Sequence, residues 1–196
     1  MKVVAATKNK GKIMEISEIL SALGIDVVSL DDMGIDVDIE ETGITFEENA
    51  RIKAEAISLL TNEAVIADDS GLSVDFLDGA PGVYSARYAG EGATDKDRIN
   101  KLLEELKDTQ QRDAHFECAI VLKFPSGDEI VSKGEAHGRI LSEPSGDGGF
   151  GYDPVFFSKE LGKSFGDATE EEKNKVSHRA KALFGLYEKL KNREDM

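Results

Sequence analysis

Hydrophobic positions in the first thirty residues change from a short continuous run to helical spacing and back again. Residues 2–6 (KVVAA) are typical of a short buried strand, and residues 13–23 carry apolar side chains at the spacing of one helix face before Gly24. DVVSL at 26–30 predicts a second strand. The order strand, loop, helix, strand is typical of a βαβ-like opening.

Three further helix starts are marked by capping boxes, in which a threonine and an acidic residue three positions later satisfy each other's backbone donors. These boxes begin at Thr45, Thr94 and Thr169. The first predicts a helix through about Leu60, and the last precedes an amphipathic C-terminal helix around 180–190.

Extended segments fill the middle of the chain. AVIA at 64–67 and LSVDFL at 72–77 predict two strands, and the runs 115–124 and 128–140 predict a β-hairpin around the turn 125–127. Acidic or glycine-rich stretches predict the main loops, at 31–44, 79–90 and 145–154. No repeat or long linker divides the chain, so we expect one domain over residues 1–196, α/β or α+β, around one mixed sheet.

The acidic composition narrows the classes of partner. The chain of 196 residues is 40% hydrophobic, enough for a real core, and its formal net charge of −15 argues against non-specific binding to nucleic acid or anionic membrane. The single cysteine, Cys118, excludes an internal disulfide and fits a reducing cytosol. No leader is expected after Met1, and no apolar stretch approaches the ~20 residues of a membrane span. We therefore expect a cytoplasmic protein.

The stretch TKNKGK at 7–12 lies between the first strand and the first helix. Its lysines and backbone N–H groups suit a phosphate at a helix N-terminus, where the dipole favours an anion. The spacing of a P-loop is absent. A basic, solvated turn is an equally good interpretation of this stretch alone.

The adjacent carboxylates Asp68 and Asp69 follow the predicted strand 64–67. Two neighbouring carboxylates raise one pKa unless a cation neutralises them, and Mg²⁺ is the cation that takes one or two carboxylates together with substrate phosphates. The alternative is a pair of aspartates that cap a strand-end turn. Glu40 and Glu41 are candidates for a further carboxylate, with solvated surface charges as their alternative.

Two later stretches suit recognition of a flat base. GGFGYDP at 148–154 joins aromatic rings to glycines that let a ligand approach the backbone, although a packed turn fits equally well. Ser177 is a natural N-cap, and His178 and Arg179 beside it supply hydrogen-bond donors for a base or a phosphate. We expect the remaining candidates to be structural: His115, His137 and Cys118.

Taken together, these motifs resemble one family. They are T-x-N-x-x-K at Thr7, Asn9 and Lys12, EETG at 40–43, ADDSGL at 67–72, GAPGVYSARYAG at 79–90, FGYDP at 150–154 and SHR at 177–179. The set looks like the inosine triphosphate pyrophosphatase family, the dITP/XTP pyrophosphatases, in its bacterial form. The resemblance extends from residue 2 to about 190.

The resemblance implies an enzyme, a fold and a cofactor. The activity would be Mg²⁺-dependent hydrolysis of non-canonical purine nucleoside triphosphates (ITP, dITP, XTP) to the monophosphate and pyrophosphate. The fold would be an elongated mixed sheet flanked by helices, with two lobes and a central substrate cleft. The expected assembly is a homodimer.

The same resemblance implies roles for individual residues. Triphosphate binding falls to Thr7, Asn9, Lys12 and Lys53, with Lys8, Lys10 and Gly11 as their loop neighbours. Metal binding falls to Glu40 and Asp69. Asp69 is also the general base, Asp68 supports it, and Ser70 contacts the substrate. Base recognition falls to Phe150, Gly151, Tyr152, Asp153, Lys173, His178 and Arg179.

Two rival functions fit the same residues. One is a related pyrophosphatase that acts on canonical or modified pyrimidine nucleotides. The other is a nucleotide-sensing module that binds ITP with Mg²⁺ without turning it over.

Overall fold

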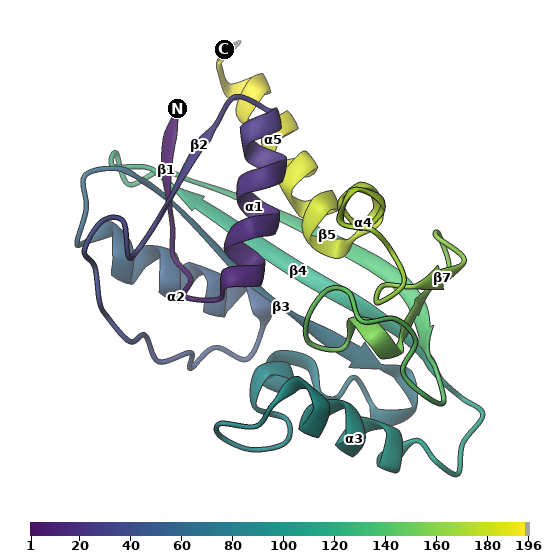
Figure 1. The fold of residues 1–196 in the computed structure, drawn as a ribbon. Coiled ribbons are helices and arrows are strands. Elements are labelled where there is room, and N and C mark those ends of the chain that lie inside the picture. The colour runs from purple at the N-terminus through teal and green to yellow at the C-terminus, as the bar shows by residue number, and fades with distance from the viewer. Residues whose placement is uncertain (195–196) are drawn as a thin grey trace. The chain divides into compact units, whose positions relative to one another are not determined.

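A seven-stranded mixed sheet with the strand order β2-β1-β3-β4-β5-β6-β7 runs through the fold (Figure 1). The computed structural model describes residues 1–194. The chain forms two compact units. The first unit comprises Met1–Asp69, Cys118–Gly134 and the chain from His178 onward, and the second comprises Ser70–Glu117 and Glu135–Ser177. The expected mixed α/β class is confirmed.

The first unit is built from strands of the mixed sheet and three helices. Its strands are β1 (Lys2–Ala5) and β2 (Asp26–Ser29), with the first part of β3 (Ala64–Val74) and parts of β4 (Asp113–Lys123) and β5 (Glu129–Ile140). Its helices are α1 (Lys10–Ala22), α2 (Phe46–Ser58) and α5 (His178–Glu194). β1 pairs in parallel with both β2 and β3, which is the arrangement that a crossover helix such as α1 permits.

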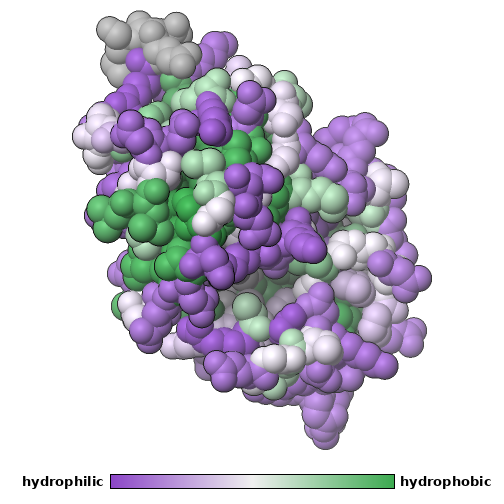
Figure 2. Space-filling view, turned by 60° about the vertical axis from the view of Figure 1, so that its left-hand side comes forward, coloured by the Kyte–Doolittle hydropathy of each residue, from purple (hydrophilic) through white to green (hydrophobic). Residues whose placement is uncertain are grey.

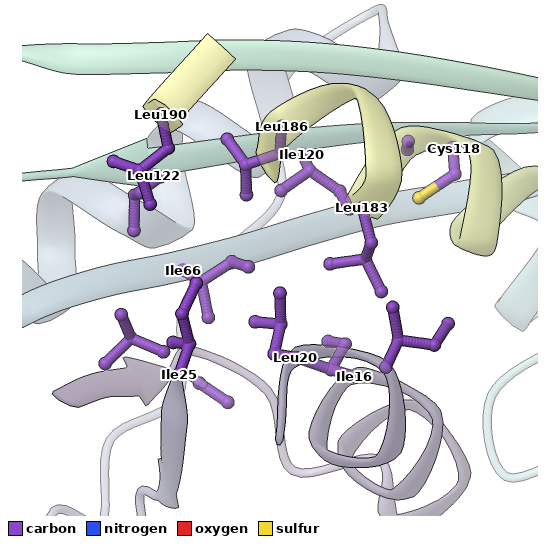
Figure 3. Packing of buried hydrophobic residues seen from close by; sticks show 14 of the residues in the cluster. Ile16, Leu20, Ile25, Ile66, Cys118, Ile120, Leu122, Leu183, Leu186 and Leu190 are labelled. Atoms are coloured by element: carbon purple, nitrogen blue, oxygen red, sulfur yellow. The ribbon is translucent and has the colours of Figure 1, made fainter. Parts of the chain in front are cut away.

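Side chains of β3 alternate between two hydrophobic clusters in this unit. Ile66 packs with Ile16 and Leu20 of α1 and with Leu183 of α5 (Figure 3). Val65 and Ala67 instead pack with Ala50, Ala54 and Ile57 of α2. Because neighbouring strand residues point to opposite faces of a sheet, α1 and α5 cover one face of β3 and α2 covers the other.

The second unit contains shorter elements around an aromatic core. They are η1 (Asp75–Leu77), η2 (Gly82–Arg87), α3 (Asp95–Glu105), η3 (Asp153–Val155), β6 (Phe156–Ser158), β7 (Lys163–Ser164) and α4 (Glu170–Val176). β6 pairs antiparallel with both β5 and β7. The rings of Phe116, Phe156 and Phe165 contact one another in the core, with centroids 4.7 Å apart for the first pair.

Local signals in the sequence are confirmed where they are strong. All three capping boxes form, at Thr45, Thr94 and Thr169, and each opens a helix. The predicted hairpin is β4 and β5, which are neighbours in the sheet and are joined by a turn in which the Gly127 amide donates to the Phe124 carbonyl. Helix α1 begins at Lys10, earlier than expected, because Asn9 caps it.

The prediction of two strands on either side of Asp68 and Asp69 is wrong. β3 continues without a break from Ala64 to Val74, and Asp75–Leu77 form a 3₁₀ turn instead of a strand end. The two carboxylates therefore lie inside a buried strand. Their burial is possible because charged and amide side chains from neighbouring helices bind them, as described below.

Polar residues dominate the face shown in Figure 2, with hydrophobic residues gathered in one area of it. None of the helices in residues 1–194 has the length and apolar character that a membrane crossing requires.

Candidate active site

The N-terminus of α1 carries the lysine-rich stretch. Asn9 is the N-cap, and its side-chain oxygen accepts a hydrogen bond from the Lys12 amide at 3.1 Å. The Thr7 hydroxyl in turn accepts from the Asn9 amide at 3.2 Å. Lys10, Gly11 and Lys12 form the first turn of the helix, which contains no acidic residue. The predicted phosphate loop is therefore a capped helix N-terminus whose dipole and lysines favour an anion.

Asp68 and Asp69 occupy consecutive positions in β3, so their side chains leave the strand on opposite faces. Asp68 lies on the same face of β3 as Ile66, which α1 and α5 cover. Asp69 lies on the same face as Ala67, which α2 covers. Although the two carboxylates are adjacent in sequence, their side chains have different hydrogen-bond partners. Their expected mutual repulsion is thus relieved by the geometry of the strand itself.

The Asp68 cluster consists of Lys12, Glu15, Asp68, Cys118 and Arg179. Oδ2 of Asp68 lies 3.1 Å from Nζ of Lys12, and 3.1 and 3.0 Å from Nε and Nη2 of Arg179. Nη1 of Arg179 donates to Glu15, and the Cys118 thiol lies 4.0 Å from Oδ2 of Asp68. Asp68 and Arg179 are each only 1% exposed.

In the Asp68 cluster, two cations face two carboxylates. Burial alone would raise the pKa of Asp68, but the charges of Lys12 and Arg179 outweigh it and hold that pKa well below its usual range. Burial would likewise lower the pKa of Arg179, and the charges of Asp68 and Glu15 raise it instead. Asp68 and Arg179 therefore form a buried ion pair.

The Asp69 cluster consists of Glu41, Asn49, Lys53 and Asp69. Nδ2 of Asn49 donates to Oδ2 of Asp69 at 3.1 Å, and Nζ of Lys53 lies 3.6 Å from Oδ1 of Asp69. Lys53 also pairs with Glu41 at 2.7 Å. Asn49 accepts from the Gly43 amide at 2.8 Å, and a Cβ at Gly43 would meet that Asn49 oxygen at 2.7 Å. The glycine of EETG thus lets the loop approach α2 closely.

In the Asp69 cluster, Lys53 pairs with both carboxylates, at 2.7 Å from Glu41 and 3.6 Å from Asp69. Burial raises the pKa of Asp69 and Glu41 adds to this rise, against the opposing charges of Lys53 and Lys12. Burial would lower the pKa of Lys53, yet Asp69, Asp68 and Glu41 raise it. Carboxylate oxygens gathered in this way are ligands that a hard cation favours.

The carboxylates of the Asp69 cluster fit such a cation as partial ligands. Within residues 1–194, no group of three or more His, Cys, Asp or Glu side chains forms a metal site by protein ligands alone. Mg²⁺ commonly takes one or two carboxylates and completes its shell with water and phosphate. Glu40 is exposed on the same loop as Glu41, and Glu41 is the one whose side chain pairs with Lys53.

The second unit holds the predicted base-binding residues in a tight turn, which we call the Phe150 loop (residues 150–153). Oδ2 of Asp153 accepts from the Phe150 amide at 2.9 Å and from Nζ of Lys173 at 2.6 Å. The same Lys173 nitrogen lies 4.7 Å from the centroid of the Phe150 ring. Gly149 precedes the turn with φ +73°, and a Cβ there would meet Asp153 Oδ2 at 2.1 Å. Only glycine fits this position.

The two aromatic rings of the Phe150 loop differ in burial. Tyr152 is 4% exposed, packs in the core of the second unit and donates its hydroxyl to the Ser85 carbonyl at 2.8 Å. Burial also raises the pKa of its phenol. Phe150 is half-buried. Of the two rings, Phe150 is therefore the one with surface available for stacking, and Tyr152 is part of the core.

Other predicted residues are placed as follows. Ser70 is half-buried in β3, and Ser177 is both the C-cap of α4 and the residue directly before α5, which is the N-cap position expected for it. His178 is buried as the first residue of α5. Lys8 pairs with Asp36 at 2.9 Å on the surface. The base-reading role of His178 and Arg179 stays a prediction, and in this structure the Arg179 guanidinium is bound by Asp68 and Glu15.

Sequence reasoning missed several participants. They are Glu15 and Asn49 in the first unit and Ser85 and Asp95 in the second. A signal existed for two of them: Glu15 follows Lys12 by three residues in α1, and Asn49 precedes Lys53 by four in α2, so each shares a helix face with a predicted site lysine.

Comparison with known proteins gives the family of this chain. The model of the Ham1 family matches residues 3–189. The chain belongs to the Ham1 family. A dITP/XTP pyrophosphatase of Bacillus subtilis (strain 168) is 52% identical over 182 residues, which are 92% of each chain. One of Shigella flexneri is 50% identical over 195 residues, 97% of this chain and 98% of the other.

Solved structures of this Ham1-family fold match along almost the whole chain. The Staphylococcus aureus Ham1 protein superimposes with a TM-score of 0.87 at 42% identity, covering 98% of this chain and 100% of the other. A HAM1 protein from Coxiella burnetii gives a TM-score of 0.88 at 40% identity, covering 98% and 99%.

Proposed function

We propose that this protein is a dITP/XTP pyrophosphatase that hydrolyses non-canonical purine nucleoside triphosphates to the monophosphate and pyrophosphate. The observation that carries the proposal is about half-identity, over nearly the full length of both chains, to enzymes of that activity. The chain is accordingly a nucleotide hydrolase. Its biological task would be to remove deaminated purines from the nucleotide pool.

Triphosphate binding falls to the N-terminus of α1 and to Lys53. Asn9 and Thr7 hold the first turn in place, so the amides and lysines of residues 8–12 are ordered before an anion arrives. Lys53 adds a further positive charge from α2. Such preorganised charge stabilises the negative charge that develops when a phosphoanhydride bond breaks.

Metal binding and water activation fall to the Asp69 cluster. Glu40 and Asp69 would hold Mg²⁺, and the carboxylates of Asp69 and Glu41 around Lys53 support a cation site at Asp69. When bound, the metal neutralises charge on the phosphates and favours pyrophosphate as leaving group. Asp69 orients a water toward the α-phosphorus and accepts its proton, while Asn49 holds Oδ2 and fixes the orientation of the carboxylate. Asp68 supports the strand from its other face.

Base binding falls to the Phe150 loop, Lys173, His178 and Arg179. The half-buried Phe150 ring offers a face for a purine, and donors from the remaining residues would select an oxygen at purine position six over the amino group of adenine. Ser70 is an additional substrate contact. A homodimer in the cytoplasm is the assembly and location that we propose with this function.

Product analysis tests the proposal. With Mg²⁺ and ITP, dITP or XTP, we expect one equivalent of pyrophosphate per monophosphate, and much lower turnover of ATP. Stepwise release of orthophosphate would contradict cleavage between the α and β phosphates. Preference for dUTP or modified pyrimidine nucleotides would favour the first rival function, and ITP binding without turnover would favour the sensing module.

A further inference from the structure

We propose that Asp95, from the first turn of α3, is a positioning residue for the Phe150 loop and thereby for discrimination between purine bases. The inference rests on the proposed function, which assigns this loop to the base. Asp95 lies 56 residues away in sequence from the loop residue that it binds.

The direct contact is a short hydrogen bond. Oδ2 of Asp95 accepts from the Gly151 amide at 2.7 Å. Gly151 has φ +62°, so the peptide that carries this amide belongs to the tightest part of the turn. A carboxylate that accepts from a backbone amide forms one of the stronger hydrogen bonds in proteins.

Asp95 is itself fixed by its helix. It directly follows the N-cap Thr94, whose capping box with Asp97 defines the first turn of α3. Its other carboxylate oxygen pairs with Arg98, and Arg98 also donates to the carbonyls of Ala86 and Ala93 at 2.9 and 2.7 Å. The amide of Gly151 is thus attached to a rigid element and not to another loop.

The loop has two further anchors in the same unit, and neither of them holds Gly151 directly. Asp153 holds the Phe150 amide and Lys173, and the Tyr152 hydroxyl binds the Ser85 carbonyl. Gly151 lies between these two anchored residues and is the position with the widest conformational range. The contact with Asp95 fixes it, and with it the direction of the Phe150 ring.

Loss of this contact should weaken recognition of the base more than binding of the phosphates. A ring that samples several directions stacks on a purine less well, which lowers affinity for the nucleotide and reduces the difference between competing bases. Chemistry at the α-phosphorus involves no residue of this loop. The expected signature is therefore a change in KM and in the ITP/ATP ratio of kcat/KM, with kcat less affected.

The test compares Asp95→Ala with Asp95→Asn in the full-length enzyme. We expect Asp95→Ala to raise KM for ITP about tenfold, as expected for loss of a hydrogen bond to a charged group, and to lower the ITP/ATP ratio. Asp95→Asn retains an oxygen that can accept from Gly151 and should restore most of both values. Inhibition by inorganic tripolyphosphate, which has no base, should be the same in all three proteins.

Glu104→Ala is the matched control, because it removes an exposed acidic residue from the other end of α3, where the side chain pairs with Lys107, and keeps the capping box intact. It should leave the ITP/ATP ratio unchanged. A ratio that is unchanged in Asp95→Ala, or changed equally in Glu104→Ala, would overturn the inference. Wild-type enzyme that fails to turn over ITP would instead refute the proposed function, so the two failures are distinguishable.

Tyr152→Phe gives a second, independent measurement. It removes the hydroxyl that binds Ser85 and keeps the buried ring. Combined with Asp95→Ala, it should lower the ITP/ATP ratio further than either change alone. If the double variant discriminates as well as the wild type, the anchors do not set base recognition.

Discussion

The Asp68 and Asp69 clusters differ in enclosure although their central residues are neighbours in one strand. On one face of β3, Asp68 binds Lys12 and Arg179, and the guanidinium that also binds Glu15 is 1% exposed. On the other face, Lys53 pairs with Asp69 and Glu41, and the Glu41 side chain is 28% exposed. A deeply buried ion pair stabilises the fold around it, whereas a carboxylate that reaches solvent can accept a ligand.

The two faces of β3 therefore have to be considered separately when roles are assigned to Asp68 and Asp69. The sequence DD invites one interpretation for both carboxylates, but the two-residue period of a strand gives each a separate environment. Opposite pKa shifts follow, downward for Asp68 and upward for Asp69. Variants of the two residues should therefore fail in different ways.

Asp69→Asn should produce the largest effect. Loss of the proton acceptor is expected to lower kcat for ITP by about 10²–10⁴-fold. Because Lys53 keeps Glu41 as a partner after the change, the melting temperature should stay close to the wild-type value. Pyrophosphate release and a thermal melt measure the two quantities, and near-normal kcat would disprove the assignment of the general base.

Asp68→Asn should instead reduce stability. The change removes the carboxylate that pairs with Lys12 and with the buried Arg179, and breaking a buried pair in this way costs about 3–5 kcal/mol. For a chain of this size, each kcal/mol lowers the melting temperature by roughly 2–4 °C. At temperatures well below the transition, kcat should fall less than in Asp69→Asn.

A second substitution tests the origin of that loss. Adding Arg179→Met to Asp68→Asn removes the guanidinium left without its main partner, so part of the lost stability should return. If the double variant is less stable than Asp68→Asn by the full cost of Arg179→Met alone, the two residues are not coupled and the Asp68 cluster is not one network.

Variants of Glu40 and Glu41 test which glutamate binds the metal beside Asp69. Glu40→Gln removes the proposed metal ligand and should raise the Mg²⁺ concentration for half-maximal activity by about tenfold or more. Glu41→Gln removes the partner of Lys53 and should have a smaller effect on that concentration. Activity titrated with Mg²⁺ at saturating ITP measures both, and the reverse order would make Glu41 the ligand.

Much of the fold was accessible from local sequence signals, because capping boxes, turns and helical periodicity act over a few residues. Thr45, Thr94 and Thr169 mark helix starts in the structure as they do in the sequence. The continuity of β3 through Asp68 and Asp69 was not accessible, because it depends on charges supplied by distant helices. Arg179 reaches Asp68 across 111 positions of the chain.

Some residues of the candidate site could likewise be predicted from the sequence, and others could not. Lys12, Lys53 and the Phe150 loop are recognisable by motif, and the structure gives each a defined environment. Glu15, Asn49 and Asp95 are ordinary helix residues in sequence, and only their partners in space distinguish them. Sequence reasoning therefore identifies the residues proposed to touch substrate better than the residues that hold them.

Labelling of the Cys118 thiol measures directly whether solvent reaches the Asp68 cluster, and this prediction involves the smallest change in stability. Its thiol lies 4.0 Å from Asp68 Oδ2, it is 0% exposed, and burial together with the charge of Asp68 raises its pKa. A buried thiol with a raised pKa forms little thiolate, so a thiol reagent should modify the folded protein far more slowly than the denatured protein. Cys118→Ala should cost about 1 kcal/mol or less of stability, and should leave kcat unchanged. Rapid labelling of Cys118 in the native state would mean that the Asp68 cluster opens to solvent, and the contrast between the two faces of β3 would then be one of degree.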